Sequence, residues 1–343
     1  MVRALLVPAA MMAATAAAAS LRMLSLNTLC ADDSFSPGWG TRGEMARRDA
    51  LVAGGMTDAA ARQFLLSTRY QRVAAFLREA QETHNALALQ EMDLLTVAGG
   101  EYFLKYFDVE NGPWRVACNV ASPTEQEMVL VNTDEIKVLK NASWTENGVV
   151  GCSATVQLDS QDEPITLMSF HMKAGFIRDP VKFNDTLVRF MNTMPQDDSV
   201  VVAGGDFNVN IPNVVDRMTN LNGDKYLWAH RTADNETDLG FTTQHEFNFL
   251  GAYDGFITRN YDDQADDSTF VWAQGLMPKY LGFNASTYGQ SPFSYADGAY
   301  PSVAGNLIFN DQDLGEENWA NMSISDHMAV SSSFFTDRCD DDK

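Results

Sequence analysis

Several acidic side chains of this sequence stand beside short apolar runs, where a buried strand would begin or end. Glu91 follows the run 86–89, and Asp326 comes just before the run 328–335. One or two such carboxylates can hold a hard divalent cation, which neutralises charge on a phosphoryl group. Taken alone, a carboxylate at a strand end is more often a cap or a surface group. Glu91 and Asp326 are therefore candidate metal ligands, pending support from their neighbours.

Two short motifs place an acid next to another polar group. In Asp206-Phe207-Asn208, a turn could aim a carboxylate and an amide into one pocket, and the preceding Gly204-Gly205 allows close backbone approach. The simpler interpretation is an Asx-turn after a strand. In Asp326-His327, the acid could fix the tautomer of the imidazole or share metal and base duties with it.

Cationic side chains cluster after a further histidine. His171 ends the apolar run 165–170, and Lys173 lies two residues beyond it, on the same face if the strand continues. We expect Lys173 and Arg178 to help hold the phosphates of a substrate. The alternative for Lys173 is an ion pair with a carboxylate at the rim of the site.

These polar residues need buried strands and covering helices to position them. Alternation of apolar residues or short apolar runs predict strands that deliver a polar side chain at or near one end; they span 21–29, 86–89, 165–170, 199–203, 250–253 and 328–335. Apolar residues on one face predict a helix over 69–83, with Arg69 and Arg72 off that face, and Asp179-Pro180 is typical of a helix start. The pattern indicates an α/β protein.

We find no internal repeat and no composition break that would mark a linker. The stretch 30–68 has the composition of an insertion. The stretch 259–318 is rich in glycine, asparagine and aromatics, and we expect it to form a wall of the substrate site. One domain over 20–338 is predicted, followed by an acidic tail, 339–343.

The N-terminal residues 1–19 have the composition of a cleaved signal peptide, with Arg3 before an apolar stretch and small residues at its end. No later stretch approaches the ~18 uninterrupted apolar residues that a membrane span needs. We therefore expect a secreted protein without stable membrane insertion. Asn-X-Ser/Thr sequons agree with N-glycosylation; they begin at Asn141, Asn184, Asn235, Asn284 and Asn321.

The four cysteines allow three pairings of two disulfides in an oxidising compartment. Cys118 and Cys152 flank neighbouring strand-like runs and are the preferred pair.

The formal net charge of −22 argues against a generic polyanion-binding module, because such a field repels nucleic acid at long range. It does not exclude a phosphate substrate held by a metal ion. The acidity favours a small substrate slightly over a long polyanion.

Six motifs, in order, resemble those of the endonuclease/exonuclease/phosphatase superfamily: Leu24-Ser25-Leu26-Asn27, Leu89-Gln90-Glu91, Phe170-His171-Met172-Lys173-Ala174, Gly205-Asp206-Phe207-Asn208, Ala252-Tyr253-Asp254 and Ser325-Asp326-His327. The resemblance covers 21–335. It implies a four-layer α/β sandwich, in which two packed, mainly antiparallel sheets are flanked by helices, with the site at one edge of the sheets.

The resemblance also implies a role for each matched residue. Glu91 would be the principal ligand of Mg²⁺ or Mn²⁺, with Asn27 and Asp326 completing the metal set. Asp206 would orient or deprotonate the attacking water, while Asn208 and His171 would stabilise the phosphoryl group. Asp254 would orient His171 or share proton transfer, and His327 would act with Asp326.

Three details lean toward the deadenylase/nocturnin group: Arg69 and Arg72 one helix before the Gln-Glu motif, the sequence after His171, and Phe241-Thr242-Thr243 before Asp254. Arg69 and Arg72 are therefore candidate substrate-binding residues. The pair Gly255-Phe256, where that group has Tyr-Ile, departs from its pattern.

The substrate stays open at this point. The first hypothesis is a secreted nuclease or nucleotide phosphodiesterase, 3′–5′ exonuclease-like, with single-stranded nucleic acid or a nucleotide stacked on Trp272, Tyr280 or Tyr288. The second is a sphingomyelinase-like phospholipase or a small-molecule phosphatase. The third is a catalytically inactive binding protein on the same fold.

Overall fold

The computed structural model of the protein describes residues 20–28, 42–92, 112–121, 125–146, 148–159, 163–177, 179–197, 199–209, 211–224, 226–228, 243–244, 250–251, 253–261, 270–272 and 330–335. The expected signal peptide, the acidic tail and most of the stretch 259–318 lie outside these residues.

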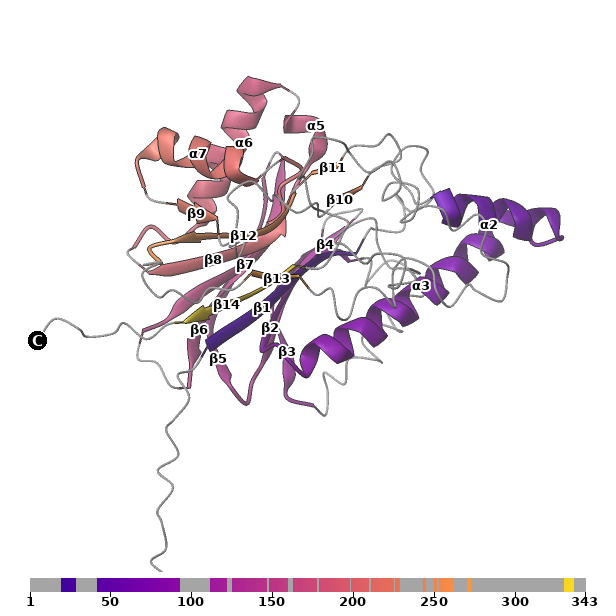
Figure 1. Ribbon diagram of the computed structural model, residues 1–343, viewed down its shortest axis with the longest axis horizontal. Coiled ribbons are helices and arrows are strands. Elements are labelled where there is room, and N and C mark those ends of the chain that lie inside the picture. Colours follow the sequence, from indigo (N-terminus) through magenta and orange to yellow (C-terminus); the bar gives the residue numbers. More distant parts are fainter. Residues whose placement is uncertain are drawn as a thin grey trace, which may run out of the picture.

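Two six-stranded sheets form the centre of the molecule (Figure 1). The first has the order β13-β14-β1-β2-β4-β3, and only β1 and β2 run parallel in it. Its strands are β13 (Phe270–Trp272), β14 (Val330–Phe335), β1 (Ser20–Asn27), β2 (Ala86–Met92), β4 (Gln126–Asn132) and β3 (Trp114–Ala121).

The second sheet has the order β5-β6-β7-β8-β12-β9, and only β7 and β8 run parallel in it. Its strands are β5 (Ile136–Glu146), β6 (Val149–Leu158), β7 (Ile165–Met172), β8 (Val200–Asp206), β12 (Asp254–Arg259) and β9 (Tyr226–Trp228). A separate two-stranded sheet pairs β10 (Thr243–Gln244) with β11 (Leu250–Gly251). The mainly antiparallel sheets that were expected are confirmed.

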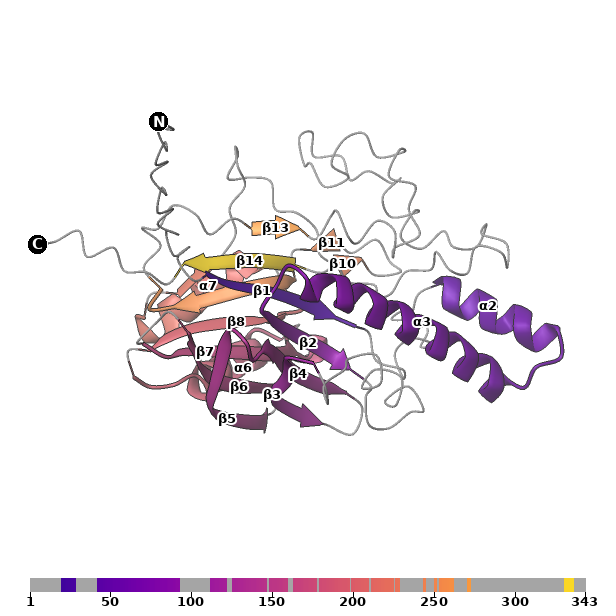
Figure 2. The same cartoon turned by 90° about the horizontal axis from the view of Figure 1, so that it is seen from below.

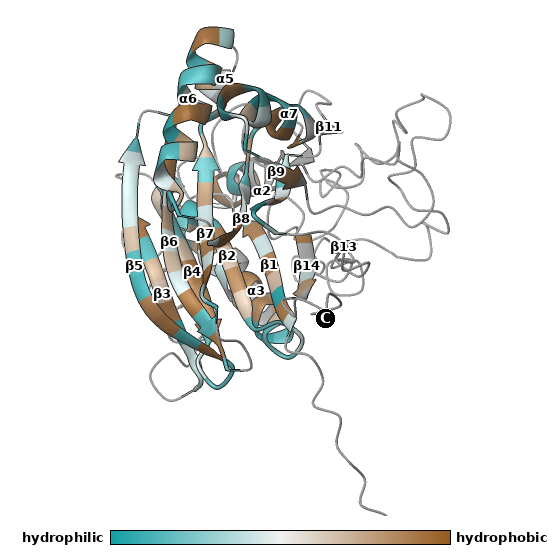
Figure 3. Cartoon of the chain, turned by 90° about the vertical axis from the view of Figure 1, so that its left-hand side faces the viewer, coloured by the Kyte–Doolittle hydropathy of each residue, from teal (hydrophilic) through white to brown (hydrophobic). Residues whose placement is uncertain are grey.

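Alternation along the strands builds one core between the sheets and another beneath the helices of the second sheet. Ile165 and Leu167 face the first sheet, whereas Met168 and Phe170 pack with helix residues such as Phe190. The helices on that outer side are α6 (Pro180–Thr193) and α7 (Ile211–Asn222), and the short α5 (Ala174–Ile177) precedes them. Figure 3 shows the apolar segments along the central strands and the hydrophilic edge strand β5.

The outer face of the first sheet is covered by the C-terminal part of a long helix, α3 (Asp58–Gln81). Tyr70, Val73 and Leu77 are buried there. Four layers result, as predicted: α3, the first sheet, the second sheet, and α6 with α7 (Figure 1).

The second half of the stretch 30–68, which was expected to be an insertion, contains helices that the sequence did not predict. A helix, α2 (Arg42–Ala53), precedes α3, and α3 itself begins at Asp58 rather than near Arg69. Thr57 caps α3, because its side chain accepts a hydrogen bond from the Ala60 amide at 3.2 Å. The two helices form a hairpin that projects from the sandwich (Figures 1 and 2).

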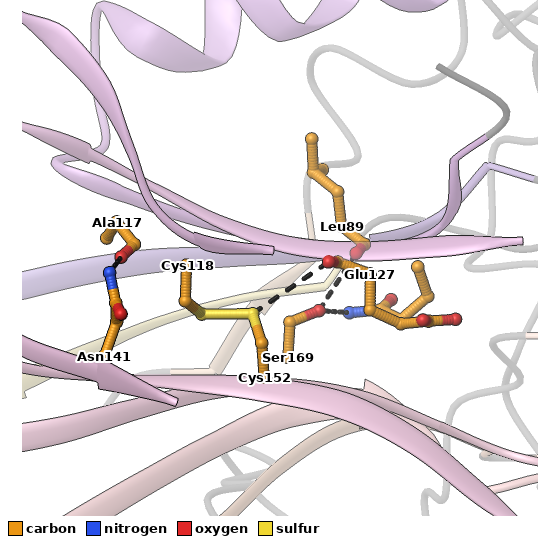
Figure 4. Close-up of a disulfide and its surroundings, with 8 residues drawn as sticks. Leu89, Ala117, Cys118, Glu127, Asn141, Cys152 and Ser169 are labelled. Atoms are coloured by element: carbon orange, nitrogen blue, oxygen red, sulfur yellow. Dashed lines mark hydrogen bonds between the residues drawn. A yellow bond between two sulfur atoms is a disulfide. The ribbon is translucent and has the colours of Figure 1, made fainter. Parts of the chain in front are cut away.

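A buried disulfide ties the two sheets together. Cys118 on β3 and Cys152 on β6 have Cα atoms 5.8 Å apart and face each other across the central core (Figure 4). The preferred pairing is therefore confirmed. Among the helices that the structure describes, none is long and apolar enough to cross a membrane.

Candidate active site

Four of the predicted site residues meet at one edge of the sandwich because both parallel strand pairs end there. Asn27 closes β1, His171 lies near the end of β7, and Asp206 closes β8. Asp254 opens the antiparallel β12, opposite Asp206 in the register, while the sequence predicted it at the end of a strand. All four are buried, with at most 8% of their surface exposed.

Strand alternation explains which face these side chains take. Asn27 has the same parity as the core residues Leu21 and Met23, and His171 has that of Ile165 and Leu167. They therefore point into the space between the sheets.

Glu91 departs from this alternation and is turned by its own backbone. The register between β2 and β4 shifts between Leu89 and Met92, and Glu91 has a φ of +53°. A bulge of this kind redirects a side chain. A left-handed conformation costs about 1–3 kcal/mol for a residue other than glycine, and such strain concentrates at functional sites. The strain at Glu91 thus coincides with the residue predicted to hold the metal.

Asn27 bridges the two sheets at the site. Its Nδ2 donates to Glu91 Oε1 at 2.9 Å and to Asp206 Oδ2 at 3.1 Å. Glu91, the predicted metal ligand, and Asp206, the predicted water-activating residue, therefore both bind the side-chain amide of Asn27. In this arrangement Asn27 presents its nitrogen, and not its carbonyl oxygen, to both carboxylates.

The motif Asp206-Phe207-Asn208 forms an Asx-turn and a site at once. Asp206 Oδ1 accepts from the Asn208 backbone amide at 2.7 Å, and Asn208 has a φ of +53°. The second carboxylate oxygen, Oδ2, accepts from the Asn208 side chain at 3.1 Å. Asn208 Nδ2 also donates to the Met172 carbonyl at 2.7 Å and lies 3.0 Å from His171 Nε2. The Asx-turn is therefore present, and it places the carboxylate and the amide of the motif side by side.

Gly205 allows the strands to approach closely enough for this turn. It lies opposite Phe170 in the parallel pairing of β7 and β8. A Cβ atom there would overlap the Phe170 backbone oxygen and crowd the Phe170 ring. The close approach predicted for the two glycines is thus present.

Glu125 is a site residue that the sequence analysis missed. It directly precedes β4, is 5% exposed, and accepts from His171 Nδ1 at 2.9 Å through Oε2. Its other oxygen, Oε1, pairs with Lys173 Nζ at 2.8 Å. The alternation of side chains along β4 could have indicated it. Glu125 is on the same face of the strand as Val129 and Val131, which belong to the central core.

The charges of this group are strongly coupled. Burial alone would lower the pKa of His171, but Glu91, Glu125 and Asp206 outweigh it and raise that pKa to about 10. Burial would raise the pKa of Glu125, yet the hydrogen bonds and charges of His171 and Lys173 lower it to about 2. At neutral pH the site therefore holds a protonated imidazole beside ionised Glu125.

Glu127, two residues further along the chain on the same face of β4, was also missed. It is fully buried, and neither carboxylate oxygen has a hydrogen-bond partner in the part of the chain that the structure describes. Burial, followed by the charge of Glu125, raises its pKa well above the ordinary value. Glu127 is therefore a buried acid behind the charged group, and its surroundings favour its neutral form.

A buried polar layer lies directly under the site. Gln90 Nε2 donates to Ser169 Oγ at 3.0 Å, and that hydroxyl donates to the Leu89 carbonyl at 2.9 Å (Figure 4). Ser25 Oγ reaches Gln90 Oε1 at 3.4 Å. Ser25, Gln90 and Ser169 stand one or two positions before Asn27, Glu91 and His171. The layer fixes the spacing of the sheets beneath the reacting groups.

The remaining predicted residues are placed as follows. Lys173 is half-buried in its ion pair with Glu125, which is the alternative considered for it. Arg69 and Arg72 lie on α3, but their side chains are outside the described residues, as are Arg178, Asp326 and His327 altogether.

The donors present fit a hard divalent cation. Glu91, Glu125 and His171 each offer one ligand atom, and these atoms lie within 4.8 Å of one another. His171 Nε2 is 3.4 Å from Glu91 Oε1 and 3.8 Å from Asp206 Oδ2. The carboxylate oxygens of Glu91 and Glu125 at this buried edge of the sandwich match the preference of Mg²⁺ and Mn²⁺ for oxygen ligands. Since His171 and Glu125 are paired with each other, Glu91 is the member of this group that would hold such an ion.

Solved structures with the same architecture identify the fold. An endonuclease/exonuclease/phosphatase family protein from Bacteroides thetaiotaomicron aligns over 94% of this chain and 99% of its own, with a TM-score of 0.56 at 12% identity. The chain has the endonuclease/exonuclease/phosphatase fold. Truncated TDP2 from Caenorhabditis elegans covers 92% of this chain and 98% of its own (TM-score 0.51, 14% identity). A mannosyl-6-phosphatase from Bacteroides thetaiotaomicron covers 91% and 98% (TM-score 0.51, 11% identity).

No family model matches the sequence, and no curated protein sequence matches it. At these identities the similarity establishes the fold of this chain, and its chemistry has to be argued from the site.

Proposed function

We propose that this protein is a divalent-metal-dependent phosphoester hydrolase. The observation that carries the proposal is the buried edge where Glu91, His171 and Asp206 converge from the two sheets, with Asn27 joining them. A core without catalytic duty has no reason to gather so many charges, because burying them costs free energy. A strained Glu91 adds to this argument.

The side chains divide the reaction between them. A bound Mg²⁺ or Mn²⁺ would neutralise phosphoryl charge and stabilise the leaving oxygen, with Glu91 as its principal ligand. Asp206 Oδ2 accepts the proton of the attacking water. Asn208 Nδ2 and the His171 imidazole would stabilise the non-bridging oxygens as charge develops there. Glu125 holds the imidazole in place from behind. Asp326 and His327 remain proposed members of the metal and base set.

We favour a nuclease or nucleotide phosphodiesterase, 3′–5′ exonuclease-like, acting outside the cytosol. The inter-sheet disulfide and the sequons support a secreted, N-glycosylated protein. A phospholipid or small-molecule phosphatase is the main alternative. An inactive binding protein is disfavoured by the retained acids and the strained Glu91.

A substrate panel tests the proposal. Single-stranded DNA and RNA, nucleotides, sphingomyelin and sugar phosphates are assayed with Mg²⁺, with Mn²⁺ and with EDTA. We expect hydrolysis that vanishes in EDTA and returns with either metal, and Asp206→Asn should lower kcat at least ~10²-fold. Full activity in chelator, or a wild-type kcat in Asp206→Asn, would contradict the mechanism. Mass spectrometry of protein made in a eukaryotic host tests secretion, cleavage near Ser20 and glycosylation.

A further inference from the structure

The α2–α3 hairpin carries a charge opposite to that of the rest of the molecule. Residues 42–81 hold seven arginines and no lysine against four acidic residues, a net charge of +3 in a chain of −22, which leaves −25 for the remainder. The arginines are Arg42, Arg47, Arg48, Arg62, Arg69, Arg72 and Arg78. Arginine is the side chain best suited to phosphate, because its planar fork donates two parallel hydrogen bonds.

This hairpin extends past the edge of the sandwich that bears the active site. The strands β1 and β2, which end at Asn27 and near Glu91, point toward the side from which the hairpin projects (Figure 2). Helix α3 has 24 residues, and its C-terminal part packs on the sheet. At about 1.5 Å per residue the helix is about 36 Å long, against about 23 Å for the seven-residue β2. The N-terminal part of α3 and α2 therefore lie beyond the site edge.

The free end of the hairpin exposes apolar side chains, including an aromatic ring. Phe64 is 42% exposed, Met56 41% and Val52 39%, while Ala61 and Leu65 are buried. Three partly exposed side chains offer far less than the roughly 800 Å² per partner that a stable protein interface buries. They do offer a stacking surface for a base, since every nucleobase presents a π-face to an aromatic ring.

Two of the hairpin's arginines, Arg48 and Arg62, are held in partly exposed ion pairs, and Arg48 also pairs with Asp49 at 2.7 Å. Asp58 accepts from Arg62 at 2.8 Å and lies 3.6 Å from Arg48, and all three side chains are partly exposed. Exposed ion pairs of this kind contribute about 0–1 kcal/mol, so phosphates can replace the carboxylate at little cost.

We propose that the α2–α3 hairpin is a docking surface for single-stranded nucleic acid, which it guides toward the active-site edge. Arg48 and Arg62 contact the phosphate backbone and Phe64 stacks on a base. This inference rests on the proposed function and specifies an extended polyanion as the substrate. The acidity of the remaining chain does not oppose it at the projecting end, because charges are screened over about 8 Å at physiological salt.

Binding without turnover tests the hairpin directly. The affinity for a fluorescein-labelled oligodeoxythymidylate of about 20 nucleotides is measured by anisotropy in EDTA, at several salt concentrations. Phe64→Ala should weaken binding at least about fivefold. Arg48→Ala/Arg62→Ala should weaken it and reduce the slope of log Kd against log salt by about 0.7 per arginine. All variants should retain the wild-type melting transition.

Matched controls come from the opposite side of the molecule. Arg189 and Arg217 are exposed on α6 and α7, and Leu139 is 45% exposed on β5. Arg189→Ala/Arg217→Ala and Leu139→Ala should leave the oligonucleotide affinity within about twofold. None of the hairpin variants should change turnover of bis(p-nitrophenyl) phosphate, which is too small to reach the hairpin.

The outcomes separate this inference from the proposed function. Oligonucleotide binding that is absent, or equal in all variants, overturns the docking role even if the small phosphodiester is hydrolysed. Loss of binding to phosphatidylserine vesicles, or of dimerisation, with unchanged oligonucleotide affinity also overturns it, in favour of a membrane or a second copy. Absence of hydrolysis on every substrate removes the proposed function, and the anisotropy in EDTA then decides the docking role alone.

Discussion

Two residues of the site, Glu91 and His171, adopt unusual local states, one in its backbone and the other in its protonation. Glu91 reaches the metal side of the edge through a left-handed backbone and a bulge in β2. His171, on the second sheet, is held protonated between two carboxylates of the first sheet, with Nδ1 on Glu125 and Nε2 toward Glu91. The left-handed backbone of Glu91 and the buried charge of His171 each cost free energy. Contacts with neighbouring residues offset that cost. Changing either residue should therefore affect function more than the loss of one contact suggests.

Glu91→Gln tests the metal-binding assignment. The amide keeps the shape of the side chain but removes the charge, so we expect kcat/KM to fall at least ~10²-fold and the Mg²⁺ concentration for half-maximal activity to rise. The matched control is Glu146→Gln, an exposed glutamate paired with Arg189, which should change neither. Metal titrations of the three proteins measure both quantities. An unchanged metal requirement in Glu91→Gln would assign the ion to other residues.

Glu125→Gln tests the buried ion pair through its pH dependence in EDTA. The pKa of Glu125 is lowered from 4.5 to about 2, so its contribution to stability is complete above 4.5 and is lost as pH falls toward 2. The pKa of His171 is raised from 6.5 to about 10, so its contribution is complete below 6.5 and is lost as pH rises toward 10.

The difference in unfolding free energy between wild type and Glu125→Gln should therefore be largest between pH 4.5 and 6.5. Breaking a buried pair costs about 3–5 kcal/mol, and we expect the lower end because the amide retains a hydrogen bond. Urea denaturation across pH measures the difference. A difference that stays flat from pH 4.5 to above pH 9 would show that the pair is not ionised as described.

At the scale of elements, the strands that carry Asn27, His171 and Asp206 could be predicted from the sequence. The position of Glu125 and the bulge at Glu91 could not. The runs that end at Asn27, His171 and Asp206 are short, apolar and punctuated by polar residues, so each strand end was visible. Glu125 stands at the start of an antiparallel strand, where no apolar run precedes it. The turn of Glu91 into the site depends on a register shift against β4, which strand alternation alone does not reveal.

Helix α2 and the N-terminal part of α3 were missed for a related reason, although the helix over 69–83 was predicted. The apolar residues of α2 do not gather on one face, and alanine and arginine dominate its sequence. The same composition is typical of a polar insertion, so no helix was predicted there. Asp254 was placed correctly at the edge but on the wrong end of its strand, since an apolar run also precedes it.

Gly205→Ala tests the close approach of β7 and β8. The added methyl group would meet the Phe170 backbone oxygen and ring, which belong to packed strands and cannot move away. Overpacking of this kind costs about 1–3 kcal/mol or more, and we expect the upper end with a loss of activity, because Asp206 is the next residue. Gly175→Ala is the control, since a Cβ there meets nothing within 4 Å. Thermal and urea unfolding compare them, and equal stability would mean that the strands can separate locally.

At the scale of the whole molecule, the active site lies in the seam, that is, the interface between the two sheets. Asn27 and Glu91 belong to the first sheet, and His171 and Asp206 to the second. Their spacing depends on the central core, the polar layer under the site, and the disulfide between β3 and β6. A link across the seam should thus stabilise both the fold and the site.

Removing that link is the test at this scale. Cys118 and Cys152 are 34 residues apart, and a crosslink closing such a loop stabilises a protein by about 3–4 kcal/mol. Cys118→Ala/Cys152→Ala should lower the unfolding free energy by about that amount in urea titrations. A dithiol reductant should destabilise the wild type at least as much once unfolding exposes the bond. Because Cys152 lies opposite Ser169, two residues before His171, kcat should fall in the variant more than KM rises. If the variant keeps wild-type stability and kcat, the seam is held by packing and the polar layer without help from the disulfide.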